Sequence, residues 1–252
     1  MRKRLWVILG IIVGIAVISV MAYCVFSIGK IDVNTTVDIA VLSQEEKNEI
    51  IALSGIKKGK NIFAIDEDIA IENIEKSLPT LKVISIERTF PNGVYIYVTK
   101  RTPVFYLALS GGEYAILDRE LKIISIQNSY DAQLTQLVGV KAENIEVGNI
   151  LPNSQILAKI IKGAEQSKGR FVNARFCAFY RKVEVDSSYV YLTSNTGVIF
   201  QLPISSNIDM SVIGSYGYYI GDENGFEGLS EKGKSEGYVY LDKHGWSWKE
   251  NL

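Results

Sequence analysis

The chain has 252 residues, of which 47% are hydrophobic and 22% are charged, and its formal net charge is −1. This composition indicates a folded chain with room for one or two apolar cores, and it leaves no basic surplus for binding nucleic acid. Two cysteines and one histidine exclude a framework of several disulfides and a metal site built from several histidines.

An uncharged run over residues 5–28 follows a basic tail at residues 1–4. A helix of 24 residues is about 36 Å long, which exceeds the ~30 Å hydrocarbon core of a bilayer. Fourteen of these residues are Leu, Ile, Val or Phe, and together they contribute about −4 to −8 kcal/mol to membrane insertion. We therefore predict a transmembrane helix over 5–28, a cytoplasmic tail over 1–4, and the remainder outside the cell. A cleaved signal peptide is the alternative, although its apolar region would span only about 7–15 residues.

Two further features concern this predicted helix. Gly10 and Gly14 form a small-residue pair of the kind that brings two membrane helices together, although glycine is common in such helices without this role. Cys24 lies within the predicted span and Cys177 far from it, so we expect no disulfide between them.

Residues 29–101 predict a compact β-α-α-β-β domain. A strand is expected over 30–39, followed by a helix that begins with a capping box at Ser43 and Glu46 and ends at Gly55. Asp66 is expected to cap a second helix, which Pro79 closes. Two alternating strands follow, joined by a turn at residues 91–93. Their expected inward positions are Ile84, Ile86, Phe90, Val94, Ile96 and Val98.

Residues 102–252 predict a mostly antiparallel β-domain with one main helix over 153–167. Strands are expected over 104–109, 114–118, 122–126, 174–185, 189–193, 198–202, 238–242 and 246–249. The Gly- and Ser-rich stretch 203–237 gives no clear pattern apart from a short candidate helix at 206–215.

The loop that contains Gly55, Gly59 and Lys60 looks at first like a phosphate-binding loop. A P-loop needs four residues between its first glycine and the Gly-Lys pair, and then Ser or Thr, whereas this loop has three residues and then Asn61. A P-loop also follows a strand, and this loop follows a predicted helix. We therefore predict no nucleotide binding, and we interpret Gly55 as a helix C-cap and Gly59 as a turn residue.

No set of residues has the spacing of a catalytic site. His244 lies in a predicted turn, and Cys177 lies in a predicted strand as a small buried side chain. Asp118, Glu184 and Asp186 lie on strands or strand ends without a feature that pairs them as glycosidase carboxylates. We predict no enzyme activity, cofactor or metal. An exported cell-wall-modifying enzyme, either a hydrolase or a transpeptidase, is the alternative.

The last two predicted strands are rich in aromatic residues, which makes them a candidate partner-binding surface. A terminal strand with large aromatic anchors suits the addition of a partner's strand. The alternative is that these rings cover the domain's own core. The candidate residues are Tyr238, Val239, Tyr240, Leu241, Asp242, Trp246 and Trp248.

Several short motifs, taken in order, resemble the POTRA domain of the bacterial division proteins FtsQ and DivIB. They are Gly55-Ile56, Gly59-Lys60-Asn61-Ile62-Phe63, Arg88-Thr89-Phe90-Pro91, Arg101-Thr102-Pro103-Val104 and Tyr114-Ala115-Ile116-Leu117-Asp118. The resemblance covers residues 1 to 125 by motif, and the remainder by length and strand pattern. We expect Phe63 and Phe90 in the core, Pro91 in the turn and Pro103 at the domain boundary. Arg88 and Arg101 are expected either to pair with nearby acids or to be solvated.

The resemblance implies an α+β protein with a transmembrane helix at 5–28, a POTRA domain at 29–101 and a β-domain at 102–252. It implies a non-catalytic scaffold in the cell membrane at the division septum, which helps to control septal peptidoglycan synthesis. Implied partners are an FtsB/DivIC-like protein at the C-terminal strands, an FtsL-like protein, septal wall synthases and the lipid bilayer. The family motif there resembles Tyr-Val-Asp-Leu-Arg, and this chain has Tyr240 in place of the aspartate and Asp242 in place of the arginine, so partner contacts are expected to differ there. A POTRA-bearing secretion component is a third reading, but such chains continue into a long membrane barrel.

Overall fold

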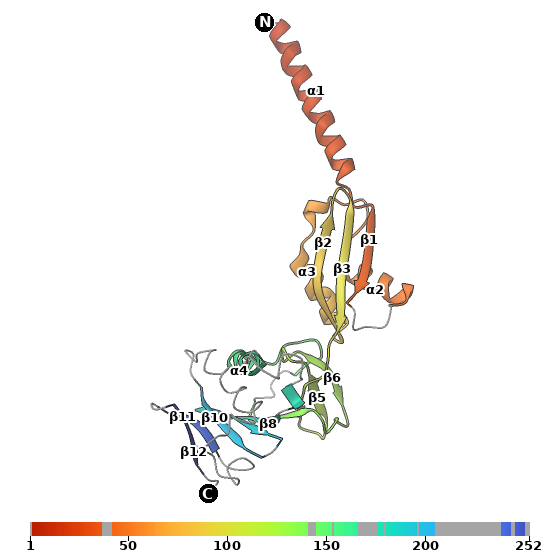
Figure 1. Ribbon diagram of the computed structural model, residues 1–252. Helices are drawn as coiled ribbons and strands as arrows, with labels where there is room; N and C mark the ends of the chain where they lie inside the picture. The colour runs from red at the N-terminus through yellow and green to blue at the C-terminus, as the bar shows by residue number, and fades with distance from the viewer. Residues whose placement is uncertain are drawn as a thin grey trace. The chain divides into compact units, whose positions relative to one another are not determined.

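The computed structural model describes residues 2–36, 42–140, 145–152, 154–165, 176–178, 180–195, 197–204, 238–242 and 245–249. The chain divides into two compact units, Met1–Arg101 and Thr102–Leu252 (Figure 1). Each unit contains helices and a sheet, in agreement with the predicted α+β class. The predicted helix at 206–215 and the turn residue His244 lie outside the described residues.

The first unit begins with helix α1, Arg2–Val25. Its described side chains are exposed, and most of them are large and apolar, as at Leu9, Ile12, Val17 and Ile18. The side chains of residues 2–5, 7, 8 and 22 lie outside the described set. Within the part of the chain that is described, no helix reaches the length and hydropathy that a membrane crossing requires. The transmembrane helix over 5–28 stays a prediction.

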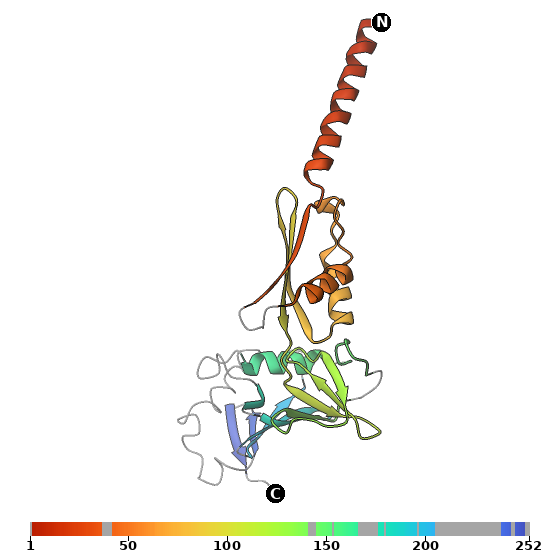
Figure 2. The same cartoon turned by 90° about the vertical axis from the view of Figure 1, so that its right-hand side faces the viewer.

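A three-stranded sheet and two helices follow α1 in the first unit. Strand β1, Lys30–Thr35, runs parallel to β3, Gly93–Lys100, which pairs antiparallel with β2, Leu81–Thr89. Helices α2, Gln44–Ser54, and α3, Glu67–Ser77, cover one face of this sheet (Figure 2). A short 3₁₀ helix, η1, spans Ile62–Ala64 between them. The order of strands and helices is the predicted one.

The helix ends follow the sequence signals. Ser43 Oγ accepts the N–H of Glu46, and the Glu46 carboxylate accepts the N–H of Ser43, so both bonds of the predicted capping box are present. Gly55 ends α2 with φ of 70°, a left-handed conformation that glycine adopts without a Cβ clash. The Asp66 side chain caps α3 by accepting the N–H of Ile69 at 3.1 Å.

The core of the first unit lies between the helices and the sheet. Val94, Ile96 and Val98 of β3 are fully buried in it, as their alternation predicts. The prediction for β2 is wrong at Ile84, which is 50% exposed. The pairing of β2 with β3 shifts between Val83 and Ser85, and this irregularity places Val83 in the core in place of Ile84, while Ile86 is buried as predicted.

A buried ion pair joins α3 to the end of the hairpin. The Arg101 guanidinium lies 2.6 Å from the Glu75 carboxylate, and its side chain is only 2% exposed. Arg101 Nε also donates to the carbonyl oxygen of Leu81, and Glu75 also accepts the N–H of Val83. Four backbone or side-chain groups from α3, β2 and the exit of β3 thus meet at one point. Of the two alternatives for Arg101, pairing with an acid is the one observed.

The second unit is built on a single nine-stranded sheet in the order β12-β11-β10-β9-β8-β7-β4-β5-β6. Among the described strands, five neighbouring pairs are antiparallel and three are parallel. The strands are β4 Phe105–Ala108, β5 Tyr114–Leu117, β6 Ile123–Gln127, β7 Thr135–Val138, β8 Tyr180–Val185, β9 Tyr189–Ser194, β10 Ile199–Pro203, β11 Tyr238–Asp242 and β12 Gly245–Lys249.

One face of this sheet carries the main core, onto which helix α4, Gln155–Glu165, packs with Leu157, Ile160 and Ile161. The strand predicted over 174–185 is shorter than expected, because Phe176–Ala178 form a 3₁₀ helix, η2, before β8 begins. The prediction for Cys177 is therefore wrong in both respects. It lies in η2, not in a strand, and it is partly exposed, while Phe176 is the buried residue.

Gly139 occupies a tight position just beyond β7. Its φ is 74°, and a Cβ built there would overlap the carbonyl oxygen of Val185, the last residue of β8. Strands β7 and β8 are parallel neighbours in the middle of the sheet. Any side chain at position 139 must therefore push two central strands apart.

We predict that Gly139→Ala destabilises the second unit more than Gly112→Ala does. Both glycines have positive φ, but a Cβ at Gly112 meets nothing within 4 Å. The Gly112 variant should lose about 1 kcal/mol from backbone strain alone, and the Gly139 variant about 1–3 kcal/mol more from overlap. Urea unfolding of the two full-length variants in detergent, followed by circular dichroism, measures the difference. Equal losses would contradict the overlap at Val185.

A second prediction concerns the buried pair. Arg101→Met should raise the free energy of the folded first unit by about 3–5 kcal/mol, because Glu75 is left buried without its counterion. Hydrogen exchange of the β2 and β3 amides measures this loss in the first unit separately from the second. The double variant Glu75→Met with Arg101→Met should regain much of it, and a double variant no better than Arg101→Met would refute the pairing argument.

Candidate interaction surfaces

The loop between α2 and η1 uses its backbone groups within the first unit. Gly59 donates its N–H to the carbonyl oxygen of Ile28 at 2.8 Å, and Ile28 donates its own N–H to Lys60 at the same distance. The N–H of Ile62 is bonded to the carbonyl oxygen of Phe26. These bonds tie the loop to the segment that leaves α1. They account for Gly59, with φ of 82°, as a turn residue rather than part of a phosphate cradle.

Three phenylalanine side chains meet at this end of the first unit. Phe63 of η1 and Phe90 of the β2–β3 turn have ring centroids 5.4 Å apart. Phe26, directly after α1, lies 5.2 Å from Phe63 and 6.1 Å from Phe90. The core assignment of Phe63 and Phe90 was wrong, since they are 60% and 56% exposed. Alternation indicated an inward Phe90, but β2 ends at Thr89 and the chain turns before that position. We call Phe26, Phe63 and Phe90 the phenyl cluster.

Arg88 and Asn61 hold the segment that carries Phe63. Arg88 donates from Nε to the carbonyl oxygen of Ile62 at 3.1 Å and from Nη2 to that of Ile65 at 3.0 Å. Its Nη1 lies 2.5 Å from the Glu67 carboxylate at the start of α3. The Asn61 side chain accepts the N–H of Phe63 at 2.8 Å and so caps η1. Arg88 is therefore paired with an acid, and its main geometric effect is to fix the backbone around Phe63.

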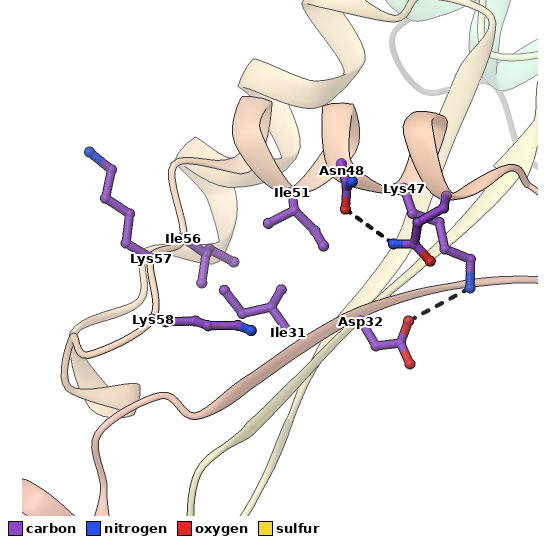
Figure 3. A pocket seen from close by; sticks show the side chains of 9 residues that line it. Ile31, Asp32, Lys47, Asn48, Ile51, Ile56, Lys57 and Lys58 are labelled. Atoms are coloured by element: carbon purple, nitrogen blue, oxygen red, sulfur yellow. Dashed lines mark hydrogen bonds and ion pairs between the residues drawn. The ribbon is translucent and has the colours of Figure 1, made fainter.

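A shallow pocket lies between β1 and α2 (Figure 3). It encloses about 420 Å³ above Ile31, Ile51 and Ile56. Its rim is polar and carries three lysines, Lys47, Lys57 and Lys58, and one acid, Asp32; Gln44 and Asn48 complete the rim. Among the described strands, β1 is an edge of its sheet, and the pocket borders this strand.

Asp32 is held in its charged form at this rim. Partial burial acts to raise the pKa of Asp32, but the N–H of Val33 and the ammonium groups of Lys47 and Lys30 outweigh it, so the pKa lies below its ordinary value. The two ammonium groups are 3.6 Å and 3.5 Å from the carboxylate. Asp32 therefore keeps its negative charge at neutral pH, and it offsets part of the basic charge around the pocket.

The C-terminal strands form a hairpin at one end of the second sheet. In register, Val239 of β11 lies opposite Trp248 of β12, and Leu241 lies opposite Trp246. Val239 is also in register with Phe200 of β10, which is fully buried. Among the described strands, β12 has a neighbour on one side only. Tyr238, Tyr240 and Asp242 complete β11. Apart from Tyr240, which is partly exposed, the side chains of both strands lie outside the described set.

The acids considered for catalysis each have a local structural contact. Asp118 is buried and accepts the N–H groups of Glu120 and Lys122 in a turn. Asp186 accepts those of Ser188 and Tyr189, and these two bonds lower its pKa below the ordinary value. Glu184 lies 2.8 Å from the ammonium group of Lys182. In the residues that the structure describes, no three potential ligands gather as a metal site.

A tyrosine group that sequence reasoning missed lies on the other face of the second sheet. Tyr106 of β4 stacks on Tyr130 with ring centroids 4.0 Å apart, and Tyr114 of β5 lies 4.7 Å from Tyr130. Burial, together with the hydroxyl of Tyr130, raises the pKa of Tyr106 to about 12. The pairing of β4 with β5 places Tyr106 and Tyr114 on the same face of the sheet, so these two could have been found from the strand pattern. Tyr130 comes from a loop, where no such alternation marks its position.

The remaining predicted residues have open surroundings. A Cβ added at Gly10 or Gly14 meets nothing within 4 Å, so helix packing there stays a prediction. Pro91 lies in the exposed β2–β3 turn, and Pro103 is exposed two residues after the end of the first unit.

Comparison with known proteins shows which proteins and domains this chain resembles in sequence. Residues 35–101 match the model of the FtsQ-type POTRA domain. The chain is 27% identical over 128 residues to the cell division protein FtsQ of Corynebacterium glutamicum, which covers 50% of this chain and 54% of that protein. It is 33% identical over 108 residues to the cell division protein DivIB of Clostridium acetobutylicum, covering 42% and 43%. DivIB of Clostridium botulinum is 26% identical over 149 residues, covering 59% and 56%.

The chain thus spans about half the length of the relatives that it matches. The match to the family model begins at Thr35, the last residue of β1. It ends at Arg101, where the first unit also ends. Residues 35–101 match the FtsQ-type POTRA domain, and the chain is similar to the cell division proteins FtsQ and DivIB over about half of its length.

Proposed function

We propose that this protein is a non-catalytic, membrane-anchored scaffold of bacterial cell division, which binds other division proteins outside the cell and helps to control septal peptidoglycan synthesis. The observation that carries the proposal is the match of residues 35–101 to the FtsQ-type POTRA domain, and relatives of the chain are named as cell division proteins. The second unit supports it, because Asp118 and Asp186 accept backbone N–H groups in turns and Glu184 pairs with Lys182.

The proposed anchor is the apolar segment over residues 5–28, with residues 1–4 in the cytoplasm. The segment has no charged residue and follows three basic ones, which is the charge asymmetry that orients membrane helices. Along the described part of α1, apolar side chains are exposed without a core to cover them. A lipid environment would remove this surface from water.

The proposed partner site is the edge of β12 that has no neighbour among the described strands, called the free edge below. An edge strand presents N–H and C=O groups that a partner's strand can bind, and neighbouring side chains then select the partner. We propose that an FtsB/DivIC-like protein adds a strand here and that an FtsL-like protein and the septal wall synthases join through it. Asp242 gives this chain a negative charge where the family motif is basic, so the partner is expected to carry complementary charge.

Two measurements separate the scaffold from an exported cell-wall enzyme. A fluorescent fusion of the full chain should form a band at mid-cell in dividing cells. The purified chain in detergent should release no soluble fragments from peptidoglycan and should form no new cross-links. Turnover of peptidoglycan by the chain would refute the scaffold, and uniform fluorescence around the cell would refute a septal role.

We predict that Asp242→Arg weakens binding to the FtsB/DivIC-like partner at least tenfold, equivalent to about 1.4 kcal/mol. Asp242 ends β11 opposite Gly245, the first residue of β12, so reversing its charge beside the proposed partner strand turns an attraction into a repulsion. The matched control is Glu113→Arg, which makes the same charge change in the exposed β4–β5 turn, away from β12 in the strand order. Calorimetric titration with the partner measures both. An unchanged affinity for Asp242→Arg would remove this residue from the site. Trp248→Ala should also weaken the complex.

Strand addition itself has a sharper test. Successive N–H groups of β12 point to opposite sides, so only one of Ser247→Pro and Trp248→Pro removes a donor from the free edge. The other removes a donor that faces β11. We expect one proline variant to lose the partner while keeping the melting temperature, and the other to lose thermal stability. If both proline variants bind the partner normally, the backbone of β12 does not pair with it.

A further inference from the structure

The phenyl cluster is an apolar surface that the fold holds in the open. Phe63 and Phe90 expose more than half of their accessible area, yet both rings contact each other and Phe26. The three residues come from three segments: the end of α1, η1, and the β2–β3 turn. Exposed large apolar side chains that cluster, unlike isolated ones, indicate a surface that another phase or molecule covers.

The cluster is held in place by hydrogen bonds, so it is not a loosely attached loop. Arg88 donates to the carbonyl oxygens of Ile62, the first residue of η1, and of Ile65, which directly follows it, and Asn61 caps η1 by accepting the N–H of Phe63. The carbonyl oxygen of Phe26 accepts the N–H of Ile62. This bond ties the backbone of Phe26 to η1, which carries Phe63. A surface that is ordered before it binds loses little conformational entropy on binding.

Chain connectivity places the cluster at the end of α1 whatever the angle between that helix and the POTRA domain. Phe26 directly follows Val25, the last residue of α1, and consecutive Cα atoms are about 3.8 Å apart. Phe63 and Phe90 are in ring contact with Phe26. If α1 crosses the bilayer, as the proposed function holds, the three rings lie at the level where the chain leaves the hydrocarbon.

Basic side chains accompany the rings. Lys57, Lys58 and Lys60 are exposed in the loop just before η1. This loop is bonded to the segment that leaves α1 through Gly59, Lys60 and Ile28. Aromatic and aliphatic groups bordered by lysine are the composition of surfaces that bind at the interface of anionic membranes.

We propose that the phenyl cluster inserts into the boundary between headgroups and acyl chains, while Lys57, Lys58 and Lys60 contact anionic phospholipid headgroups. The POTRA domain would then rest on the membrane surface through a second contact beside α1, which restricts how it tilts. This inference rests on the proposed membrane anchor. The inference goes beyond the anchor, because a membrane helix alone would not bring the POTRA domain itself into contact with lipid.

Spin labels on the full chain test this contact. Cys24 and Cys177 are first replaced by serine, and one cysteine is then introduced by Phe63→Cys, Ile84→Cys or Val17→Cys. Ile84 is the matched control, because it is an exposed apolar side chain of the same domain on β2. Val17 reports on α1 itself. Each labelled chain is reconstituted into vesicles of phosphatidylcholine with phosphatidylglycerol, and its collisions with oxygen and with a water-soluble nickel chelate are compared.

We expect the ratio of oxygen to nickel collisions to be several-fold higher at position 63 than at position 84, and to be high at position 17. A high ratio at 17 with equal ratios at 63 and 84 would overturn the lipid contact and leave the anchor intact. A low ratio at 17 would overturn the anchor, and the inference with it. Shielding of position 63 from both reagents would mean that protein covers the cluster, which also overturns the inference.

The basic loop is tested in the same system. Replacing Lys57, Lys58 and Lys60 by glutamine should lower the ratio at position 63 in vesicles that contain phosphatidylglycerol. It should have little effect in vesicles of phosphatidylcholine alone, where the charge attraction is absent. An unchanged ratio in the anionic vesicles would remove the three lysines from the contact.

Discussion

The buried pair of Arg101 and Glu75 is the constraint on which the POTRA domain depends. Two charges removed from water are stable only when each is paired and hydrogen-bonded, because the desolvation cost is several kcal/mol per ion. Here the guanidinium group also binds a carbonyl of β2, and the carboxylate also binds an N–H of β2. The pair can therefore form only when α3, the start of β2 and the end of β3 are all in place. It lies at Arg101, the residue with which the first unit ends.

A second arginine forms an ion pair at the other end of α3. Arg88, on β2, pairs with Glu67 in the first turn of α3, while Arg101 pairs with Glu75 near its last turn. The hairpin thus holds both ends of one helix. The Arg88 pair is about one-third exposed, so its ionic contribution is small, on the order of 0–1 kcal/mol. What Arg88 adds is position, since its two bonds to backbone carbonyls fix the turn that presents Phe63.

The parts of this fold that the sequence predicted are those set by local chemistry. The capping box at Ser43, the glycine cap at Gly55 and the alternation of Val94, Ile96 and Val98 depend on a few neighbouring residues, and the structure confirms them. Ile84 was misplaced because alternation assumes an unbroken ladder, and the shift in pairing after Val83 breaks it. Strand β7 was missed because it is four residues long and carries Thr135 and Gln136, which do not alternate as apolar and polar.

Candidate sites were harder to predict, because they join segments that are distant in sequence. The sequence motif includes Arg88, but the carbonyl oxygens that accept its hydrogen bonds, those of Ile65 and Ile62, lie 23 and 26 residues away in the sequence. The position of that turn depends on the fold of the whole domain. Phe63 and Phe90 were assigned to the core since large apolar residues usually lie there. The three phenylalanines meet only after α1, η1 and the β2–β3 turn come together, and no periodicity in the sequence marks that meeting.

The loop over residues 55–63 shows how the same residues can suggest one ligand by motif and another by structure. A phosphate cradle requires several free N–H groups that converge on one point. In this loop the N–H groups of Gly59, Lys60 and Ile62 are already bonded to protein carbonyls, so they are not available to an anion. The side chains of Lys57, Lys58 and Lys60 are exposed in the loop that leads into η1, the element that carries Phe63 of the phenyl cluster. Free cationic side chains next to exposed apolar rings suit a surface with both charged and apolar layers. A lipid interface has that order, and a nucleotide does not.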